Sequence, residues 1–251
     1  MLDVRGVSIE FGGFRAVDGV TLAVPPAAIV GIAGTNGAGK TTLFGAIAGQ
    51  LRVARGEIVF AGRDITRLAP NRRARLGLAR TFQVPREFGS LSVLDNLRAA
   101  APNDAHESLA AAWFGRAGAA RADGELERRA DDVLALTGLS TMRDQPASAL
   151  SGGQKKLLEL SRALMGSPKC ILLDEPFAGV NPVLIAQLLD VLRAVHARGI
   201  ALVVIEHNLQ ALKAVVRRLV VMDQGRVIAD GEPGAVLDDA RVQEAYMGGV
   251  V

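Results

Sequence analysis

The sequence predicts an α/β protein whose sheet-forming parts are separated by a helical insertion. Short apolar runs typical of buried strands, such as 170–173 and 200–205, alternate with segments whose apolar residues recur at helical spacing. From about residue 85 to residue 163 the pattern changes to helical, except that residues 101–124 are rich in Ala and Gly with weak periodicity and predict no definite structure. We therefore expect one domain over 1–251, in which residues 1–84 and 164–251 form an α/β core and residues 85–163 form a helical subdomain.

The composition is that of an ordinary α/β protein, since 49% of the 251 residues are hydrophobic and 22% are charged. The longest apolar runs are far shorter than the ~18 residues that a membrane-spanning helix needs, and the N-terminus lacks the features of a signal peptide. We therefore expect a cytoplasmic location. The net charge of +3 is compatible with a nucleotide or an anionic membrane surface. The single cysteine, Cys170, excludes an internal disulfide and is expected to be an inert core residue.

The first 30 residues predict strands, because Val7 and Ile9 alternate with polar residues and the run from Val20 to Val24 does the same before two prolines. Residues 28–33 form an apolar run that predicts a buried strand. Residues 57–61, between two glycines, predict another.

A glycine-rich loop follows the strand at 28–33. Residues 34–42 fit the phosphate-binding pattern G-x-x-x-x-G-K-[ST], and an apolar helical face follows, as this motif requires. Glycines permit a close backbone approach, so that N–H groups and a helix N-terminus face the phosphates. Lys40 then places a cation on the β- and γ-phosphates, and Thr41 can ligate Mg²⁺. A chance glycine-rich turn is the alternative, which the flanking elements disfavour. The predicted nucleotide-binding residues of the loop are Gly34, Thr35, Asn36, Gly37, Ala38, Gly39, Lys40, Thr41 and Thr42.

Two carboxylates follow the predicted strand at 170–173. Asp174 stands at the carboxyl end of this strand, where Mg²⁺ and its waters need an acidic ligand. Glu175 points differently and could orient or deprotonate an attacking water molecule. The alternative is an acidic turn before Pro176, but the phosphate-binding loop favours the functional interpretation.

The rest of the chain returns to the α/β pattern. Residues 184–195 carry a helical apolar stripe, residues 200–205 predict a buried strand, and residues 219–229 predict a hairpin that turns at 223–225. No internal repeat and no second phosphate-binding loop occur in the sequence. The sequence therefore predicts one nucleotide-binding unit.

Residues 151–154, Ser-Gly-Gly-Gln, admit two interpretations. Ser and Gln at this spacing form a capping box for the helix that follows. A capped helix N-terminus beside two bare glycines is also a phosphate-binding surface. Both interpretations can hold, and the double glycine exceeds what a cap requires.

The motifs at 34–42 and 150–154 together resemble those of ATP-binding-cassette (ABC) ATPases, and the likeness covers nearly the whole chain. It implies a RecA-like P-loop NTPase core with an N-terminal antiparallel β-subdomain, and an inserted helical subdomain that carries the signature motif. It also implies ATP and Mg²⁺ as cofactors and hydrolysis to ADP and phosphate. The resemblance further implies that two subunits sandwich two ATP molecules, and that each signature contacts the ATP of the partner subunit through Ser151, Gly152, Gly153 and Gln154.

The same resemblance assigns three further residues. Gln83 matches the Q-loop glutamine, which contacts Mg²⁺ and couples to a transmembrane partner. His207 matches the switch histidine at the γ-phosphate, and Phe11 stands where the family usually places a tyrosine that stacks on adenine, although Phe11 lacks the tyrosine hydroxyl. Taken alone, each residue has a structural alternative. Gln83 could be a solvated loop residue, His207 a structural residue at a strand end, and Phe11 a core residue. The implied catalytic residues are Glu175, His207 and Gln83, and the implied metal ligands are Thr41, Gln83 and Asp174.

Finer similarity at 79–83, 175–182, 205–208 and 245–248 resembles the ATPases of branched-chain amino-acid importers of the LivG type. This resemblance implies that the chain is the ATP-hydrolysing subunit of an importer and is bound peripherally at the inner face of the cell membrane. It implies no nucleic-acid partner. Its partners would be a second ABC ATPase subunit (like or unlike), two permease subunits and, indirectly, a periplasmic or extracellular solute-binding protein. The segment 177–180 also resembles the lipopolysaccharide-transport ATPase. Lipopolysaccharide export is therefore an alternative function. Urea or amide uptake and a non-transport ABC ATPase are further alternatives.

Overall fold

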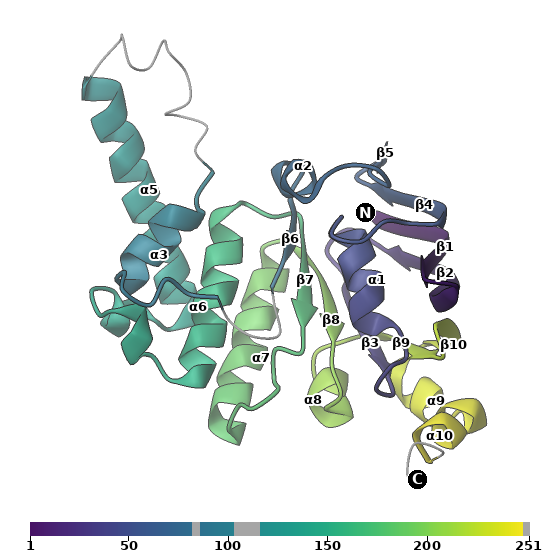
Figure 1. Ribbon diagram of the computed structural model, residues 1–251. Helices are drawn as coiled ribbons and strands as arrows, with labels where there is room; N and C mark the ends of the chain where they lie inside the picture. The colour runs from purple at the N-terminus through teal and green to yellow at the C-terminus, as the bar shows by residue number, and fades with distance from the viewer. Residues whose placement is uncertain (82–85, 103–115, 248–251) are drawn as a thin grey trace. The chain divides into compact units, whose positions relative to one another are not determined.

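The computed structural model describes residues 1–81, 86–102 and 116–247 (Figure 1). The chain forms two compact units, each described by itself. The first comprises Met1–Gln83 with Pro168–Val251, and the second comprises Val84–Ser167. The predicted α/β fold class is confirmed, since strands and helices alternate through the first unit.

The first unit contains a six-stranded sheet in the order β10-β9-β3-β8-β7-β6. Five strands run parallel, and β10 turns back on β9 as an antiparallel hairpin. The strands predicted at 28–33, 170–173 and 200–205 and the hairpin at 219–229 are confirmed, and their central residues are buried. The bounds are β3 (Ile29–Gly34), β6 (Leu78–Arg80), β7 (Cys170–Asp174), β8 (Ala201–Ile205), β9 (Arg218–Asp223) and β10 (Arg226–Gly231).

A second, antiparallel sheet of four strands lies at the N-terminal part of the chain, in the order β2-β1-β4-β5. Its strands are β1 (Leu2–Phe11), β2 (Phe14–Val24), β4 (Arg55–Phe60) and β5 (Arg63–Asp64). The apolar faces of both sheets and the helix α1 (Lys40–Ile47) contribute to one hydrophobic cluster. Burial of these faces is the main stabilising term for the unit. Figure 1 shows α1 between the two sheets.

The remaining helices of the first unit follow its strands. They are α2 (Pro70–Arg75), α7 (Pro182–Ala197), α8 (Leu209–Lys213), α9 (Pro233–Leu237) and α10 (Ala240–Met247). The stripe predicted for α7 packs inward through Leu188, Val191, Leu192 and Val195. Arg73 of α2 is buried and donates to the carbonyl oxygens of Ala46 and Ile47, which satisfies the C-terminal end of α1.

In the second unit the described secondary structure is mainly helical, with α3 (Val93–Ala100), α5 (Arg116–Thr137), α6 (Gly152–Met165) and the short 3₁₀ turns η1 (Ser140–Met142) and η2 (Ala147–Ala149). The predicted capping box at the start of α6 is confirmed: the Ser151 hydroxyl accepts from Gln154 N at 3.3 Å, and Gln154 Oε1 accepts from Ser151 N at 2.9 Å. In the middle of the helix, the buried Ser161 hydroxyl bonds Thr137 of α5 at 2.9 Å.

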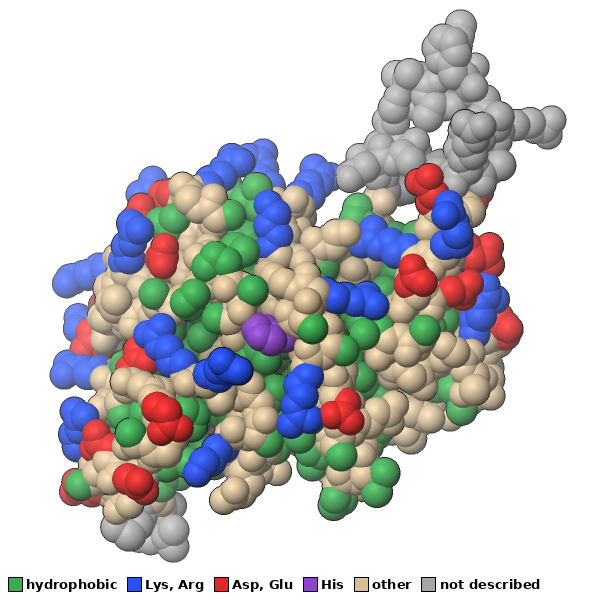
Figure 2. Space-filling view, turned by 180° about the vertical axis from the view of Figure 1, so that it is seen from behind, with side chains coloured by type: hydrophobic (Ala, Val, Ile, Leu, Met, Phe, Trp, Pro, Cys, Tyr) green, Lys and Arg blue, Asp and Glu red, His purple; other side chains and the backbone are tan. Residues whose placement is uncertain are grey.

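The described helices include none long and apolar enough to cross a membrane. On the face drawn in Figure 2, Lys and Arg side chains are interspersed with Asp and Glu. This mixed surface agrees with the small net charge of +3.

Candidate nucleotide-binding and hydrolytic site

The glycine-rich loop joins β3 to α1, as predicted. α1 begins at Lys40, and Gly39 stands at its N-cap with φ 94° and no side-chain cap. The N-terminal N–H groups of the helix are therefore available to an anion, and its dipole favours negative charge there. Gly39 is required sterically as well, because a Cβ at this position would lie 2.5 Å from the carbonyl oxygen of Ala16 in β2.

Lys40 folds back over the loop that precedes it. Its side chain is buried, and its ammonium donates to the carbonyl oxygens of Gly34 at 2.9 Å and Thr35 at 2.7 Å. Burial lowers the pKa of Lys40, while the charges of Glu175 and Asp174 raise it. The parallel pairing of β3, β7 and β8 places the loop and both carboxylates at one edge of the sheet, where these strands end.

Asp174 is the last residue of β7 and is only 3% exposed. Its carboxylate accepts from Arg80 Nη2 of β6 at 2.8 Å, and Arg80 also donates to Gln50 Oε1 at 2.5 Å. The guanidinium lies 6.0 Å from the centroid of the Phe44 ring. Arg80 thus joins β6, β7 and the end of α1, a role that we did not predict. The one signal for this role in the sequence is the position of Arg80 shortly before Gln83, the predicted Q-loop glutamine.

Glu175 and His207 are in direct contact. Glu175 Oε1 lies 3.0 Å from His207 Nε2, with side chains that are 14% and 38% exposed. Because a carboxylate only accepts, the imidazole Nε2–H is the donor. Glu175 has a φ of 48°, a left-handed conformation that costs a non-glycine residue energy and is held by its surroundings. Its backbone N–H donates to the carbonyl oxygen of Ile205 at 3.0 Å.

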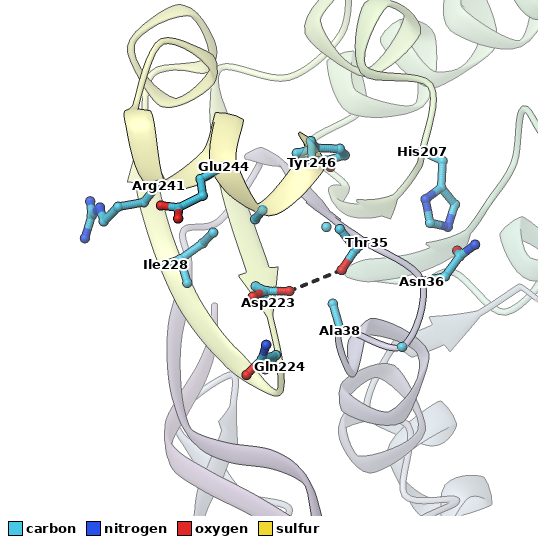
Figure 3. A pocket seen from close by; sticks show the side chains of 13 residues that line it. Thr35, Asn36, Ala38, His207, Asp223, Gln224, Ile228, Arg241, Glu244 and Tyr246 are labelled. Carbon is cyan, nitrogen blue, oxygen red and sulfur yellow. Dashed lines mark hydrogen bonds between the residues drawn. The ribbon is translucent and has the colours of Figure 1, made fainter. Parts of the chain in front are cut away.

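A pocket of about 860 Å³ lies beside the loop (Figure 3). Residues 34–38 and His207 line one part of it, and the β9–β10 turn and α10 line the rest. The Thr35 hydroxyl donates to Asp223 Oδ1 at 3.2 Å across this space. Tyr246 of α10 turns toward the loop. Burial raises the pKa of its hydroxyl, which faces the backbone of Gly34 without a well-formed hydrogen bond to any described residue. α10 therefore lines the pocket beside the glycine-rich loop.

The aromatic candidate lies on the surface. Phe11 ends β1 and pairs with Phe14 across a turn of two glycines. Their side chains are 48% and 70% exposed, so the alternative that Phe11 is a core residue is wrong. Both rings are available for stacking. β2, which Phe14 begins, passes the start of α1 at Ala16.

The predicted site residues fall into three groups according to where the structure places them. The loop residues, Asp174, Glu175 and His207 come together in the first unit. Ser151, Gly152, Gly153 and Gln154 begin α6 in the second unit, with Ser151 exposed. Gln83 lies outside the described residues. Within the described parts, no group of three or more His, Cys, Asp or Glu side chains is placed to hold a metal ion by itself.

Comparison with known proteins agrees with this geometry. Residues 17–178 match the family described as ABC transporter, and residues 226–251 match the family described as branched-chain amino acid ATP-binding cassette transporter. Two relatives are named as probable branched-chain amino acid transport ATP-binding protein LivG. The one from Archaeoglobus fulgidus is 35% identical over 99% of this chain and 95% of its own length. The one from Methanocaldococcus jannaschii is 37% identical over 99% and 97%.

Other relatives have a different name. The lipopolysaccharide export system ATP-binding protein LptB of Escherichia coli is 34% identical over 98% of this chain and 97% of its own. Among solved structures, the ADP conformation of an ATP-binding cassette of an ABC transporter superposes with a TM-score of 0.86, at 35% identity over 99% of this chain and 98% of that one. A nucleotide-free ATP-binding cassette gives 0.84 at 34% identity, over 98% of both chains. The chain therefore belongs to the ABC transporter family, as one of its ATP-binding subunits that hydrolyse ATP.

Proposed function

We propose that this subunit energises an importer for branched-chain or related amino acids. The observation that carries this proposal is the match of residues 226–251 to the branched-chain amino acid family, since the cassette motifs are common to all ABC ATPases. The matched segment includes β10 and α10, which line the pocket beside the nucleotide loop. The LivG relatives, which align over nearly the full chain, support the same assignment.

In the proposed site, the loop 34–42 holds the phosphates of ATP through backbone N–H groups and the start of α1. Lys40 exchanges its contacts with the loop carbonyls for the β- and γ-phosphates. Phe11 stacks on the adenine. The hydroxyl of Thr41 and the carboxylate of Asp174 are oxygen ligands of the kind that Mg²⁺ prefers, and the ion, when bound, neutralises charge on the phosphates. The predicted third ligand is Gln83.

Hydrolysis in this site needs a water molecule aligned with the γ-phosphate. Glu175 accepts a proton from this water while the water oxygen forms a bond to the γ-phosphorus. The bond between that phosphorus and the bridging oxygen breaks, and ADP leaves with this oxygen. His207 donates to Glu175 and fixes the carboxylate. We further propose that His207 contacts the γ-phosphate.

In the proposed mechanism, a second ATPase subunit is needed to complete the site. Its signature motif, the counterpart of Ser151–Gln154, closes over the ATP held here. A serine hydroxyl and the N–H groups of a capped helix start suit the γ-phosphate, because both are donors and the helix dipole favours an anion. The pair of subunits would act on two permease subunits at the inner face of the membrane, with an external solute-binding protein delivering the solute.

The test is uptake of labelled leucine by cells that lack the gene. Reintroducing the wild-type gene should restore ATP-dependent uptake, whereas the Glu175→Gln gene should not, although its product accumulates normally. Urea and short amides serve as alternative solutes. The assignment is wrong if uptake of all of these is normal in the deletion strain. A defect in outer-membrane glycolipid export in that strain would instead favour the function for which the LptB relatives are named.

A further inference from the structure

A buried carboxylate lies between the two loops that carry Glu175 and His207. Glu206 follows the last residue of β8 and precedes His207, and it is only 2% exposed. Its backbone N–H donates to the carbonyl oxygen of Ile32 at 3.2 Å, which fixes its position beside the end of β3. The proposed mechanism gives this side chain no role.

The two oxygens of Glu206 bind different loops. Oε1 accepts from the backbone N–H of Phe177 at 2.6 Å, in the loop after β7. Oε2 accepts from the N–H groups of His207 at 3.0 Å and Asn208 at 3.2 Å, in the loop after β8. An ionised carboxylate suits this position because both of its oxygens accept and neither donates. One side chain therefore ties the two loops together.

The tied loops are those that meet in the contact between Glu175 and His207. Phe177 is two residues beyond Glu175, whose φ of 48° must be held by its surroundings. His207 is attached to the same carboxylate through its own N–H. Loss of the tie would free both loops and so lengthen the 3.0 Å separation between Glu175 Oε1 and His207 Nε2.

A simpler role, capping of α8, does not account for these contacts. α8 already has a side-chain cap, since Asn208 Oδ1 accepts from Ala211 N at 3.0 Å. The bond to Phe177 lies outside that helix altogether. The arrangement is that of a bridge between loops.

We propose that Glu206 is a positioning residue for ATP hydrolysis, which holds Glu175 and His207 in their contact without touching the nucleotide itself. This inference rests on the proposed roles of Glu175 and His207.

The first test is the Glu206→Gln variant, assayed as the full chain. Glutamine keeps the size, but its one oxygen can serve only one loop, and its NH₂ group faces the N–H groups of the other. We expect kcat to fall about 10- to 100-fold, as small misplacements of reacting groups do, with the KM for ATP and the affinity for ATP changed less than about twofold. The control is Ser8→Ala, which removes a buried acceptor for the Gly19 N–H in the antiparallel sheet and should lower thermal stability alone.

A double-mutant cycle separates positioning from a general structural effect. If Glu206 acts through His207 and Glu175, then Glu206→Gln added to His207→Ala should lower kcat by less than about twofold further. If the two losses multiply in full, the proposal is wrong. Imidazole ¹⁵N spectra provide a direct readout, because the chain has only three histidines. The His207 signal, assigned by its loss in His207→Ala, should shift in Glu206→Gln and stay unchanged in Ser8→Ala.

The outcomes also separate this inference from the proposed mechanism. If Glu175→Gln and His207→Ala both turn over normally, the roles assigned to those residues fail. If both lose turnover while Glu206→Gln keeps wild-type kcat, the bridge alone is refuted. Should Glu206→Gln not fold, Glu206→Asp replaces it under the same criteria. The aspartate side chain is one methylene shorter, so we expect its carboxylate to reach only one of the two loops.

Discussion

Replacing Gly34 with alanine should destabilise the protein far more than replacing Gly37, although both belong to the same loop and both have positive φ. A Cβ built on Gly34 lies 2.1 Å from the carbonyl oxygen of Met222 and 3.3 Å from Ala38 Cβ. Gly34 pairs with Met222 across the parallel strands β3 and β9. The obstacle is therefore buried backbone, which cannot turn aside as a flexible side chain could.

The expected magnitudes follow from these two environments. At Gly37, φ is 81° and nothing lies within 4 Å of the new Cβ, so only the left-handed backbone conformation costs energy, about 1–2 kcal/mol. For a chain of this size that lowers Tm by about 2–8 °C. At Gly34, backbone strain of ~1–3 kcal/mol adds to overpacking of ~1–3 kcal/mol. The sum of roughly 2–6 kcal/mol is a large share of a typical stability of ~5–15 kcal/mol.

The assay is thermal unfolding of the two variants without nucleotide, followed by circular dichroism and repeated by urea titration. Omitting ATP matters, because Gly37 faces the phosphates in the proposed site and its variant could lose stabilisation by ligand. Equal Tm values for Gly34→Ala and Gly37→Ala would refute the reasoning, since the close contact with Met222 would then cost nothing. A larger loss at Gly37 would refute it more strongly.

Four further predictions follow from the site and the core. Glu175→Gln should bind ATP normally but hydrolyse it at least ~10²-fold more slowly in a phosphate-release assay, and near-normal turnover would exclude the proton-accepting role. Phe11→Ala should weaken ATP and GTP binding together by about 1–3 kcal/mol, measured by calorimetry, because stacking tolerates either base. Mixing Ser151→Arg with Lys40→Ala should restore activity that neither has alone, and no recovery at any ratio would contradict a shared site. Burial raises the pKa of Cys170 to about 12, so a thiol reagent at pH 8 should label this residue only after unfolding. The contribution of Cys170 to the free energy of unfolding should fall as the pH rises above about 9, because there the thiol loses its proton in the unfolded chain but keeps it in the folded one.

The elements that the sequence predicted well are those whose pattern is local. The strand at 170–173 and the stripe along 184–195 carry their own periodicity, and Ser151 with Gln154 forms a box whose spacing is readable in four letters. The loop at 34–42 is readable for the same reason, since its glycines and Lys40 lie close together in the sequence at fixed spacing. Local patterns of this kind need no knowledge of the tertiary fold.

Other parts of the site depend on contacts between segments that are distant in sequence. Arg80 reaches Asp174 across 94 positions, and Glu206 reaches Phe177 across 29. Neither residue belongs to a motif with a chemical reason of its own, because the reason exists only once β6, β7 and β8 are neighbours in the sheet. Exposure is similarly hidden: the sequence left open whether Phe11 is core or surface, and its place in a turn between two strands decides this.

Arg80 and Glu206, which the sequence did not predict, are charged groups attached to residues that the proposed mechanism uses, and the side chain of Arg80 is 10% exposed while Glu206 is buried. Arg80 holds the carboxylate of Asp174, and Glu206 holds the backbones that carry Glu175 and His207. A buried charge is costly unless it is paired or hydrogen-bonded, so each such group is tolerated only in the geometry that satisfies it. The edge of the sheet is thereby fixed before any nucleotide arrives. In a phosphoryl-transfer site, where the protein contributes chiefly position and electrostatics, that fixed geometry is itself a contribution to rate.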